Sequence, residues 1–180
     1  KIMKKLLFTL TLILTLAFFI KCEKDNSIDD TIILEQMTTD VILSVNNAVT
    51  VADNASNLKG ETTLQRTCPI IRFHHPDTAL FPRTIVINYG TSCIDSLGNI
   101  KSGKIITVVS APRNKVETKI FTRFDNYFFN GVKFEGKKLM VVKKVTDGEI
   151  TLLVNFRLKL TFPDGRVVQR SGERIKIVKR

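Results

Sequence analysis

The sequence predicts an α+β protein that is mainly β, an antiparallel β-meander of long strands with one N-terminal amphipathic helix packed on it. Asn130, Asp147 and Asp164 are each followed by glycine, at intervals of 17 residues. Each pair is typical of the type I′ turn, whose positive φ angles match the twist of the strands that it joins. Apolar residues alternate strictly over residues 154–162, as in a strand with one buried face.

The first 21 residues predict an export signal. Lys4 and Lys5 precede an apolar run over residues 6–20 that only threonines interrupt. This run is shorter than the roughly 20 residues of a membrane span and suits a secretory signal. Cys22 stands close behind the run, so the segment resembles a bacterial lipoprotein signal, although Lys21 occupies a position that usually holds a small residue.

We therefore expect residues 1–21 to be a signal peptide, Cys22 to be lipidated, and residues 22–30 to be a charged lipid-anchor tether. Residues 31–180 are then a single helix-plus-sheet domain, long enough to bury a core. Its membrane partner is reached through the lipid on Cys22. An uncleaved anchor with Cys22 as a bystander is the alternative, and the sequence leaves the oligomeric state open.

The chain is basic, with a net charge of +11. Residues 1–21 hold four lysines and no acids, so the remainder carries +7. A basic surface favours anionic partners, which include lipid headgroups, acidic glycans and nucleic acid.

Residues 27–55 predict one amphipathic helix. Ser27 and Asp30 have the spacing of a capping box, and acids cluster in the first turn, where they favour the helix dipole. We expect this helix to cover one face of the sheet; a partner-binding helix near the membrane is the alternative. The apolar positions at helical spacing are Leu34, Met37, Val41, Val45 and Ala48.

A polar linker over residues 54–67 separates the helix from the strands, the first three of which are predicted over residues 69–73, 84–89 and 103–110. Cys68 and Cys93 are the internal cysteines and would form a disulfide in an oxidising compartment. His74 and His75 are adjacent and would point to opposite faces of a strand. We therefore predict neither a metal site nor a cofactor.

The turn at Asp147-Gly148 predicts the register of its hairpin. It sets Val145 opposite Ile150, Val141 opposite Val154 and Leu139 opposite Phe156 as a buried face. A bulge at Gly136 would then bring Phe134 opposite Leu160. A matching irregularity is expected at Asp125-Asn126.

The same registers predict a basic outer face. Lys138 would lie opposite Arg157, and Lys159 opposite Arg170. We predict that these four cations bind an anion; long solvated side chains without a ligand are the alternative. The face lacks a ladder of aromatic residues, which disfavours single-stranded nucleic acid.

The last strand, over residues 174–178, alternates Ile175 and Ile177 with charged residues, so we expect these two side chains to be buried. Because an edge strand of this kind invites further pairing, and because the sequence starts at Lys1, we expect the natural chain to extend past Arg180. An edge protected by its charges is the alternative.

Three blocks carry a resemblance to known sequences: FPRTIVINYGTSCIDSLGNIKSGKIIT, FDNYFFNGVKFEGKK and LTFPDGR, which together begin at Phe81 and end at Arg166. They resemble predicted surface-exposed lipoproteins of Bacteroidota, a group without assigned activity, as does the charged tether after Cys22. The resemblance implies a place on the outer membrane, at the cell surface or facing the periplasm. It implies no catalytic residues.

We expect a non-catalytic binding or structural module of the cell envelope. An enzyme is not expected, because the sequence has no nucleophile elbow, zinc spacing or phosphate loop. A glycan-acting enzyme remains an alternative, since two carboxylates could pair in a cleft. Another alternative is a lipid or lipoprotein carrier with an apolar cavity between the Val41 side of the helix and the Phe156 side of the sheet. The available carboxylates are Asp95, Asp125, Glu135 and Glu173.

Overall fold

The computed structural model describes residues 26–54, 61–65, 68–74 and 79–179. The predicted signal peptide, Cys22 and the first part of the tether lie outside these residues. The chain divides into two compact units, Lys1–Thr38 and Thr39–Arg180, and helix α2 (Asn26–Asn54) belongs to both. No helix within the described ranges is long and apolar enough to cross a membrane.

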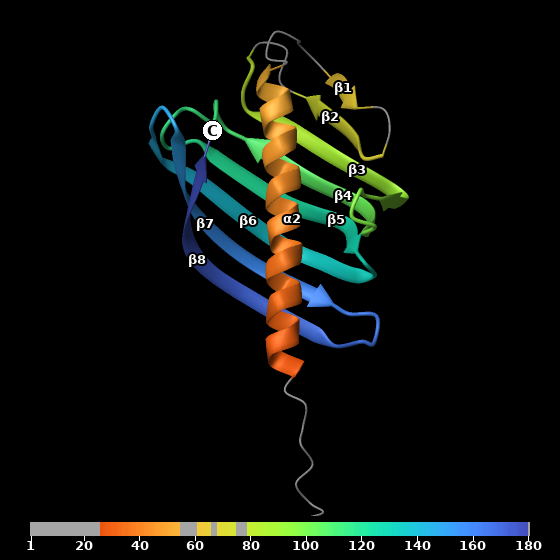
Figure 1. The fold of residues 1–180 in the computed structure, drawn as a ribbon. Coiled ribbons are helices and arrows are strands. Elements are labelled where there is room, and N and C mark those ends of the chain that lie inside the picture. The colour runs from red at the N-terminus through yellow and green to blue at the C-terminus, as the bar shows by residue number, and fades with distance from the viewer. Residues whose placement is uncertain (1–25, 55–60, 66–67, 75–78, 180) are drawn as a thin grey trace, which may run out of the picture. The chain divides into compact units, whose positions relative to one another are not determined.

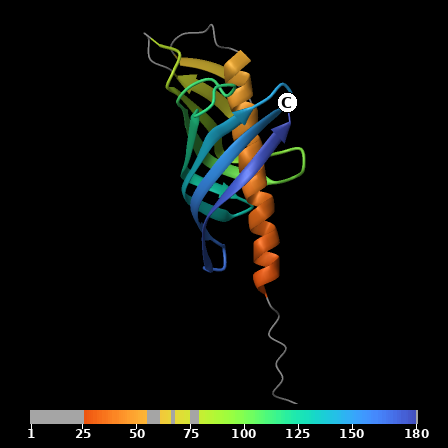
Figure 2. The same cartoon turned by 90° about the vertical axis from the view of Figure 1, so that its left-hand side faces the viewer.

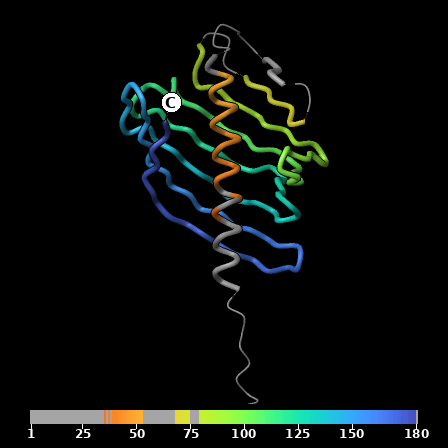
Figure 3. The backbone as a smooth tube through the Cα atoms, in the orientation of Figure 1, coloured from red at the N-terminus to blue at the C-terminus, as the bar shows by residue number. Residues whose placement is uncertain are grey.

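The described residues form a single antiparallel sheet of eight strands, which lie side by side in the order of the sequence (Figures 1 and 3). This arrangement confirms the predicted mainly β meander with one helix. The sheet is curved (Figure 2), and residues 39–54 of α2 pack on its concave face. The strands are β1 (Glu61–Gln65), β2 (Ile70–His74), β3 (Arg83–Ile94), β4 (Ile100–Val109), β5 (Lys119–Phe129), β6 (Val132–Val145), β7 (Glu149–Thr161) and β8 (Val167–Lys179).

The three glycine-containing turns close hairpins at the predicted places, but only the first has two residues with positive φ. Asn130 and Gly131 have φ angles of 47° and 79°. In the third turn Gly165 has a positive φ while Asp164 does not. This turn is closed by hydrogen bonds from the Gly165 amide to the Phe162 carbonyl and from the Arg166 amide to the Asp164 carboxylate. The second turn is closed by hydrogen bonds between Thr146 and Glu149.

The predicted register of β6 and β7 is correct at both ends and wrong between them. Val145 lies opposite Ile150 and Phe134 opposite Leu160, as expected, but the register shift falls between Val142 and Lys144 rather than at Gly136. Gly136 has another role: a Cβ there would collide with the Arg157 carbonyl oxygen.

Because the predicted shift was at Gly136 and the observed one follows Val142, the residues between these two positions lie on the opposite face of the sheet from the one predicted. Val141 lies opposite Leu153 instead of Val154, and Leu139 lies opposite Asn155 instead of Phe156. The irregularity expected at Asp125-Asn126 is confirmed, since the pairing of β5 with β6 shifts between Arg123 and Tyr127.

The core lies between residues 39–54 of α2 and the concave face of the sheet. The predicted helix positions Val41, Val45 and Ala48 are buried, and Met37 of the preceding unit is buried as well. The expected covering helix is thus confirmed for residues 39–54. Each large apolar side chain removed from water here stabilises the fold by about 1.5–3 kcal/mol. The sheet contributes Ile85, Ile87, Ile105, Ile120, Phe134, Met140, Leu152, Val154 and Leu160.

Strand β8 presents the opposite face from the one predicted. Ile175 and Ile177 pair with Leu153 and Thr151 on the convex face and are 71% and 58% exposed. The partners of the buried β7 residues Leu152 and Val154 are Lys176 and Arg174. The order of the pairing, rather than the apolar character of the isoleucines, therefore determines which side chains of β8 face the core.

Candidate functional site

The four cations predicted to form one basic face lie on two faces. Arg157 and Lys159 are exposed on the convex face, as expected. Lys138 is buried on the concave face opposite Phe156, and Arg170 lies opposite Leu158 rather than Lys159. The shift at Val142 is the physical reason for Lys138, because a displacement of one residue moves a side chain to the other face.

The convex face instead gathers a different set of cations. Arg123 of β5 lies opposite Lys137 of β6, and Lys137 lies opposite Arg157 of β7. All three side chains are exposed. We call Arg123, Lys137 and Arg157 the cation row. Directly opposite side chains in antiparallel strands have Cβ atoms about 4.5–5.5 Å apart, so the row concentrates three like charges over three adjacent strands.

Sequence reasoning missed Arg123 and Lys137, although one signal for them exists. The doublets Val141-Val142 and Lys143-Lys144 break the alternation expected of a strand with one buried face. A bulge at this point restores the alternation and places Lys137 beside Arg157.

Several cations of the sheet are paired with acids, whereas the cation row, like Lys119, Lys144 and Arg170, makes no ion pair within the described residues. The Glu135 carboxylate forms ion pairs with Lys159 Nζ at 3.1 Å and with Lys133 Nζ at 3.4 Å. Hydrogen bonds from these two lysines lower the pKa of the Glu135 carboxyl, which keeps it ionised. Lys159 is therefore neutralised locally and does not extend the row. The remaining exposed pairs are Lys104–Asp125, Lys143–Glu117 and Arg166–Asp164.

A hollow of about 460 Å³ adjoins the cation row. Lys137 and Arg157 line it together with the apolar side chains of Phe121 and Leu139. Ser171 and Gly172 of β8 also line it. The row thus lies beside a surface that can contact both the charged and the apolar parts of a ligand.

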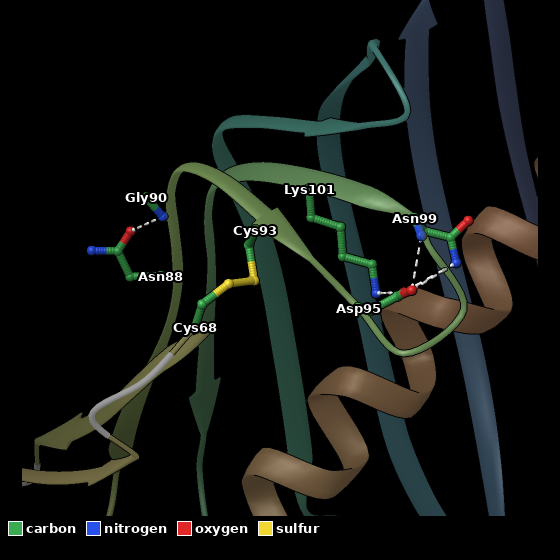
Figure 4. The surroundings of a disulfide bond; sticks show 7 residues. All are labelled: Cys68, Asn88, Gly90, Cys93, Asp95, Asn99 and Lys101. Atoms are coloured by element: carbon green, nitrogen blue, oxygen red, sulfur yellow. Dashed lines mark hydrogen bonds and ion pairs between the residues drawn. A yellow bond between two sulfur atoms is a disulfide. The ribbon is translucent and has the colours of Figure 1, made fainter.

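A second charged cluster lies at the end of the sheet where β3 turns into β4. Lys101 is 5% exposed, and its Nζ lies 2.9 Å from Asp40 of α2 and 3.0 Å from Asp95 (Figure 4 shows the contact with Asp95). Its ammonium also lies 5.4 Å from the centre of the Phe129 ring. Burial lowers the pKa of Lys101, but the hydrogen bonds to Asp40 and Asp95 outweigh it and raise the pKa overall.

Asp95 is fully engaged in holding this turn. Its carboxylate accepts hydrogen bonds from the amides of Leu97 and Asn99, from the Asn99 side chain, and from Lys101. Partial burial raises the pKa of Asp95, but these hydrogen bonds outweigh that effect and lower it to about 2. The cluster fastens α2 to the sheet. Of the four carboxylates named from the sequence, Asp95, Asp125 and Glu135 each hold a lysine.

Cys68 and Cys93 form the predicted disulfide, with Cα atoms 5.7 Å apart (Figure 4). The bond joins the segment before β2 to the end of β3. His74 is exposed on β2. Across the ranges that the structure describes, no group of three histidine, cysteine, aspartate or glutamate residues could hold a metal ion.

Comparison with known proteins gives no match: no protein-family model fits the chain, and no curated protein or solved structure is similar to it. A function has to be argued from the residues of the site, because a fold by itself does not imply one.

Proposed function

We propose that this chain is a lipid-anchored, non-catalytic binding module of the cell envelope, held to the outer membrane through Cys22. Its ligand is an anionic glycan or an anionic lipid headgroup, bound on the convex face of the sheet. The observation that carries the proposal is the cation row, three exposed cations in direct register without an acidic partner among the described residues.

The physical argument is a difference between neighbours on the same face. Like charges directly opposite one another are unfavourable, and the sheet relieves this elsewhere by placing acids beside lysines, as at Glu135. Arg123, Lys137 and Arg157 lack such relief and, unlike the other unpaired cations, lie directly opposite one another, so an anionic ligand gains most from binding there. Arginine also binds carboxylates and phosphates through two parallel hydrogen bonds.

The test is binding of the purified chain to two probes, a soluble polyuronate and vesicles that contain phosphatidylglycerol. Replacing Arg123, Lys137 and Arg157 together with glutamine should weaken binding about tenfold, since three exposed contacts contribute roughly 0.2–1 kcal/mol each. Binding by the wild type should fall as salt rises. The probe that responds identifies the source of the anion.

The matched control removes the same charge from cations that already have acidic partners: Lys104, Lys143 and Arg166 are replaced together with glutamine. This variant should bind within about twofold of the wild type. Equal losses in both triple variants would mean that net charge alone attracts the probe, which contradicts a site at the cation row.

The lipid anchor is tested separately. Metabolic labelling with a fatty-acid analogue should mark the wild type and leave Cys22→Ala unlabelled. Equal labelling of the two proteins would contradict lipidation at Cys22.

A further inference from the structure

A second row of side chains runs beside the cation row on the convex face of β5–β8, four strands that lie side by side (Figure 1). It is displaced from the cation row by two residues along each strand. Because a strand rises about 3.3 Å per residue, the two rows are about 6.6 Å apart. The members of this second row lie directly opposite one another, and we call them the mixed row: Phe121, Leu139, Asn155 and Glu173.

The apolar end of the mixed row is open to a ligand. Phe121 is 37% exposed and, together with Leu139, lines the hollow of about 460 Å³ beside the cation row. The face of an aromatic ring carries partial negative charge, which attracts the C–H groups of a pyranose ring packed against it. An exposed aromatic ring next to a row of cations therefore suits a ligand that is both ring-shaped and anionic.

The polar end of the mixed row has unused capacity for hydrogen bonds. Asn155 lines the hollow, and its amide atoms are open to solvent and make no hydrogen bond with a described residue. Glu173 is exposed and, alone among the four carboxylates named from the sequence, holds no lysine within the described ranges. An amide donates and accepts, and a carboxylate accepts hydroxyl protons. Asn155 and Glu173 can therefore bind neighbouring hydroxyl groups of one ligand.

The two rows differ in what they attract. The exposed side chains of Arg123, Lys137 and Arg157 have no ion pair with a described residue, and arginine binds a carboxylate through two parallel hydrogen bonds. Glu173, about 6.6 Å away along the strand direction, repels a second negative charge. A ligand that fits both rows carries its charge at one edge and uncharged hydroxyls at the opposite edge.

We propose that the ligand of the cation row is a uronic-acid residue of an acidic polysaccharide. This inference rests on the proposed function and selects one of its two ligand classes. The carboxylate binds the cation row, the C–H face of the pyranose ring packs on Phe121, and the hydroxyls remote from the carboxylate bind Asn155 and Glu173. A phosphatidylglycerol headgroup has no ring to cover Phe121, and a sulfated sugar brings further negative charge towards Glu173.

The first test compares two ligands that each carry four carboxylates. One is tetragalacturonate, and the other is tetra-aspartate with an acetylated N-terminus and an amidated C-terminus, which has no sugar ring. Isothermal titration calorimetry with the purified chain should show that the wild type binds tetragalacturonate at least fivefold more tightly. Equal affinities would overturn the proposal, because charge alone would then account for binding.

The second test removes the groups that read the sugar. Phe121→Leu deletes the ring but keeps an apolar side chain, and Asn155→Ala deletes the amide. Each variant should bind tetragalacturonate about threefold to tenfold more weakly, the loss expected of one or two contacts. Each should bind tetra-aspartate within twofold of the wild type, which shows that the variant is folded and that its cation row is intact.

Matched controls make the same changes elsewhere on the sheet. Phe128→Leu alters the same strand opposite Lys133, away from the cation row. Gln169→Ala removes an exposed amide opposite Lys159 on β8. Both controls should bind tetragalacturonate within twofold of the wild type. Losses in the controls as large as those in Phe121→Leu and Asn155→Ala would contradict a sugar site at the mixed row.

The outcomes separate this inference from the proposed function. If the triple glutamine variant of the cation row binds every probe as the wild type does, the proposed function itself fails. If that variant loses binding while Phe121→Leu and Asn155→Ala bind tetragalacturonate like the wild type, the anion site stands and the uronic-acid ligand is refuted. Binding of phosphatidylglycerol vesicles without binding of tetragalacturonate also refutes it, because a lipid headgroup would then be the ligand.

Discussion

The two faces of the sheet use adjacent lysines in opposite ways. Lys137 is exposed on the convex face in the cation row, whereas Lys138 is 2% exposed on the concave face opposite Thr122 and Phe156. The Nζ of Lys138 has no hydrogen-bond partner among the described residues. Burial, and then the charges of Lys176 and Arg174, lower the pKa of Lys138 to about 7.

A third lysine completes the comparison. Lys101 is buried almost as deeply as Lys138, but two carboxylates compensate its charge and its pKa is raised. Burial alone therefore does not determine what a lysine contributes to this fold. The presence or absence of an anionic partner determines whether a lysine raises or lowers the free energy of unfolding. Replacing each of the three lysines in turn tests this.

Replacing Lys101 with methionine should produce the largest effect. The change leaves Asp40 and Asp95 close together without the cation that lies between them. Removing one partner of a buried ion pair typically destabilises a protein by about 3–5 kcal/mol. We expect urea denaturation near neutral pH to show a loss of about 3 kcal/mol.

A double variant sharpens this result. Lys101→Met combined with Asp40→Asn removes one of the two stranded charges and should recover part of the loss. A double variant that is less stable than Lys101→Met would show that packing of the lysine stem, rather than charge compensation, stabilises the contact.

Replacing Lys138 with methionine should have the opposite sign. Below about pH 7 the lysine is protonated in both the folded and the unfolded protein, so folding has to bury its charge. Between pH 7 and the ordinary value of 10.5 the folded protein has lost the proton and the unfolded chain still binds it. The stability of the wild type should therefore rise with pH across this window.

The size of the rise follows from the shift in pKa. From pH 6.5 to pH 9 the wild type should gain about 2.5 kcal/mol, at 1.36 kcal/mol for each pH unit within the window. Lys138→Met should be more stable than the wild type at pH 6.5 and should lack most of the rise. Lys137→Met is the control and should retain the slope of the wild type; a slope that survives in Lys138→Met would refute the assignment.

The comparison of these lysines also shows what the sequence could predict. The meander and the disulfide follow from local signals, namely the glycine turns and the two internal cysteines. The covering helix follows from its apolar spacing, at least for residues 39–54. The glycine turns and the apolar spacing each act over a few residues, and the two internal cysteines have no other internal cysteine to pair with. Each of these features can therefore be predicted without knowledge of the rest of the fold.

The face of the sheet on which each side chain in the middle of β6 lies depends on one register shift, and no turn residue marks the position of that shift. Placing the shift at Gly136 instead of between Val142 and Lys144 moved Lys138 to the wrong face and concealed the cation row. The hollow beside the cation row was not predictable either, because four strands line it and the predicted register set Leu139 opposite Phe156 instead of Asn155. Its lining depends on the pairing of all four strands, which local patterns do not specify.

The smallest expected effect concerns Lys137 itself. Lys137→Gln should raise stability by about 0.3 kcal/mol at low salt, because it relieves repulsion from Arg123 and Arg157. The gain should vanish at about 1 M salt, where the Debye length is only about 3 Å. Lys143→Gln, which removes a charge paired with Glu117 at 2.9 Å, should lower stability by a similar amount under the same low-salt conditions.

The opposite signs of these two substitutions are what distinguish the cation row from an ordinary basic surface. Both remove one exposed lysine from β6 or its end, and both change the net charge equally, so any effect of total charge cancels in the comparison. Thermal denaturation of the two variants side by side, at low and high salt, measures the difference. If both variants lose stability, the row carries no unrelieved repulsion, and the driving force that we assign to anion binding there is absent.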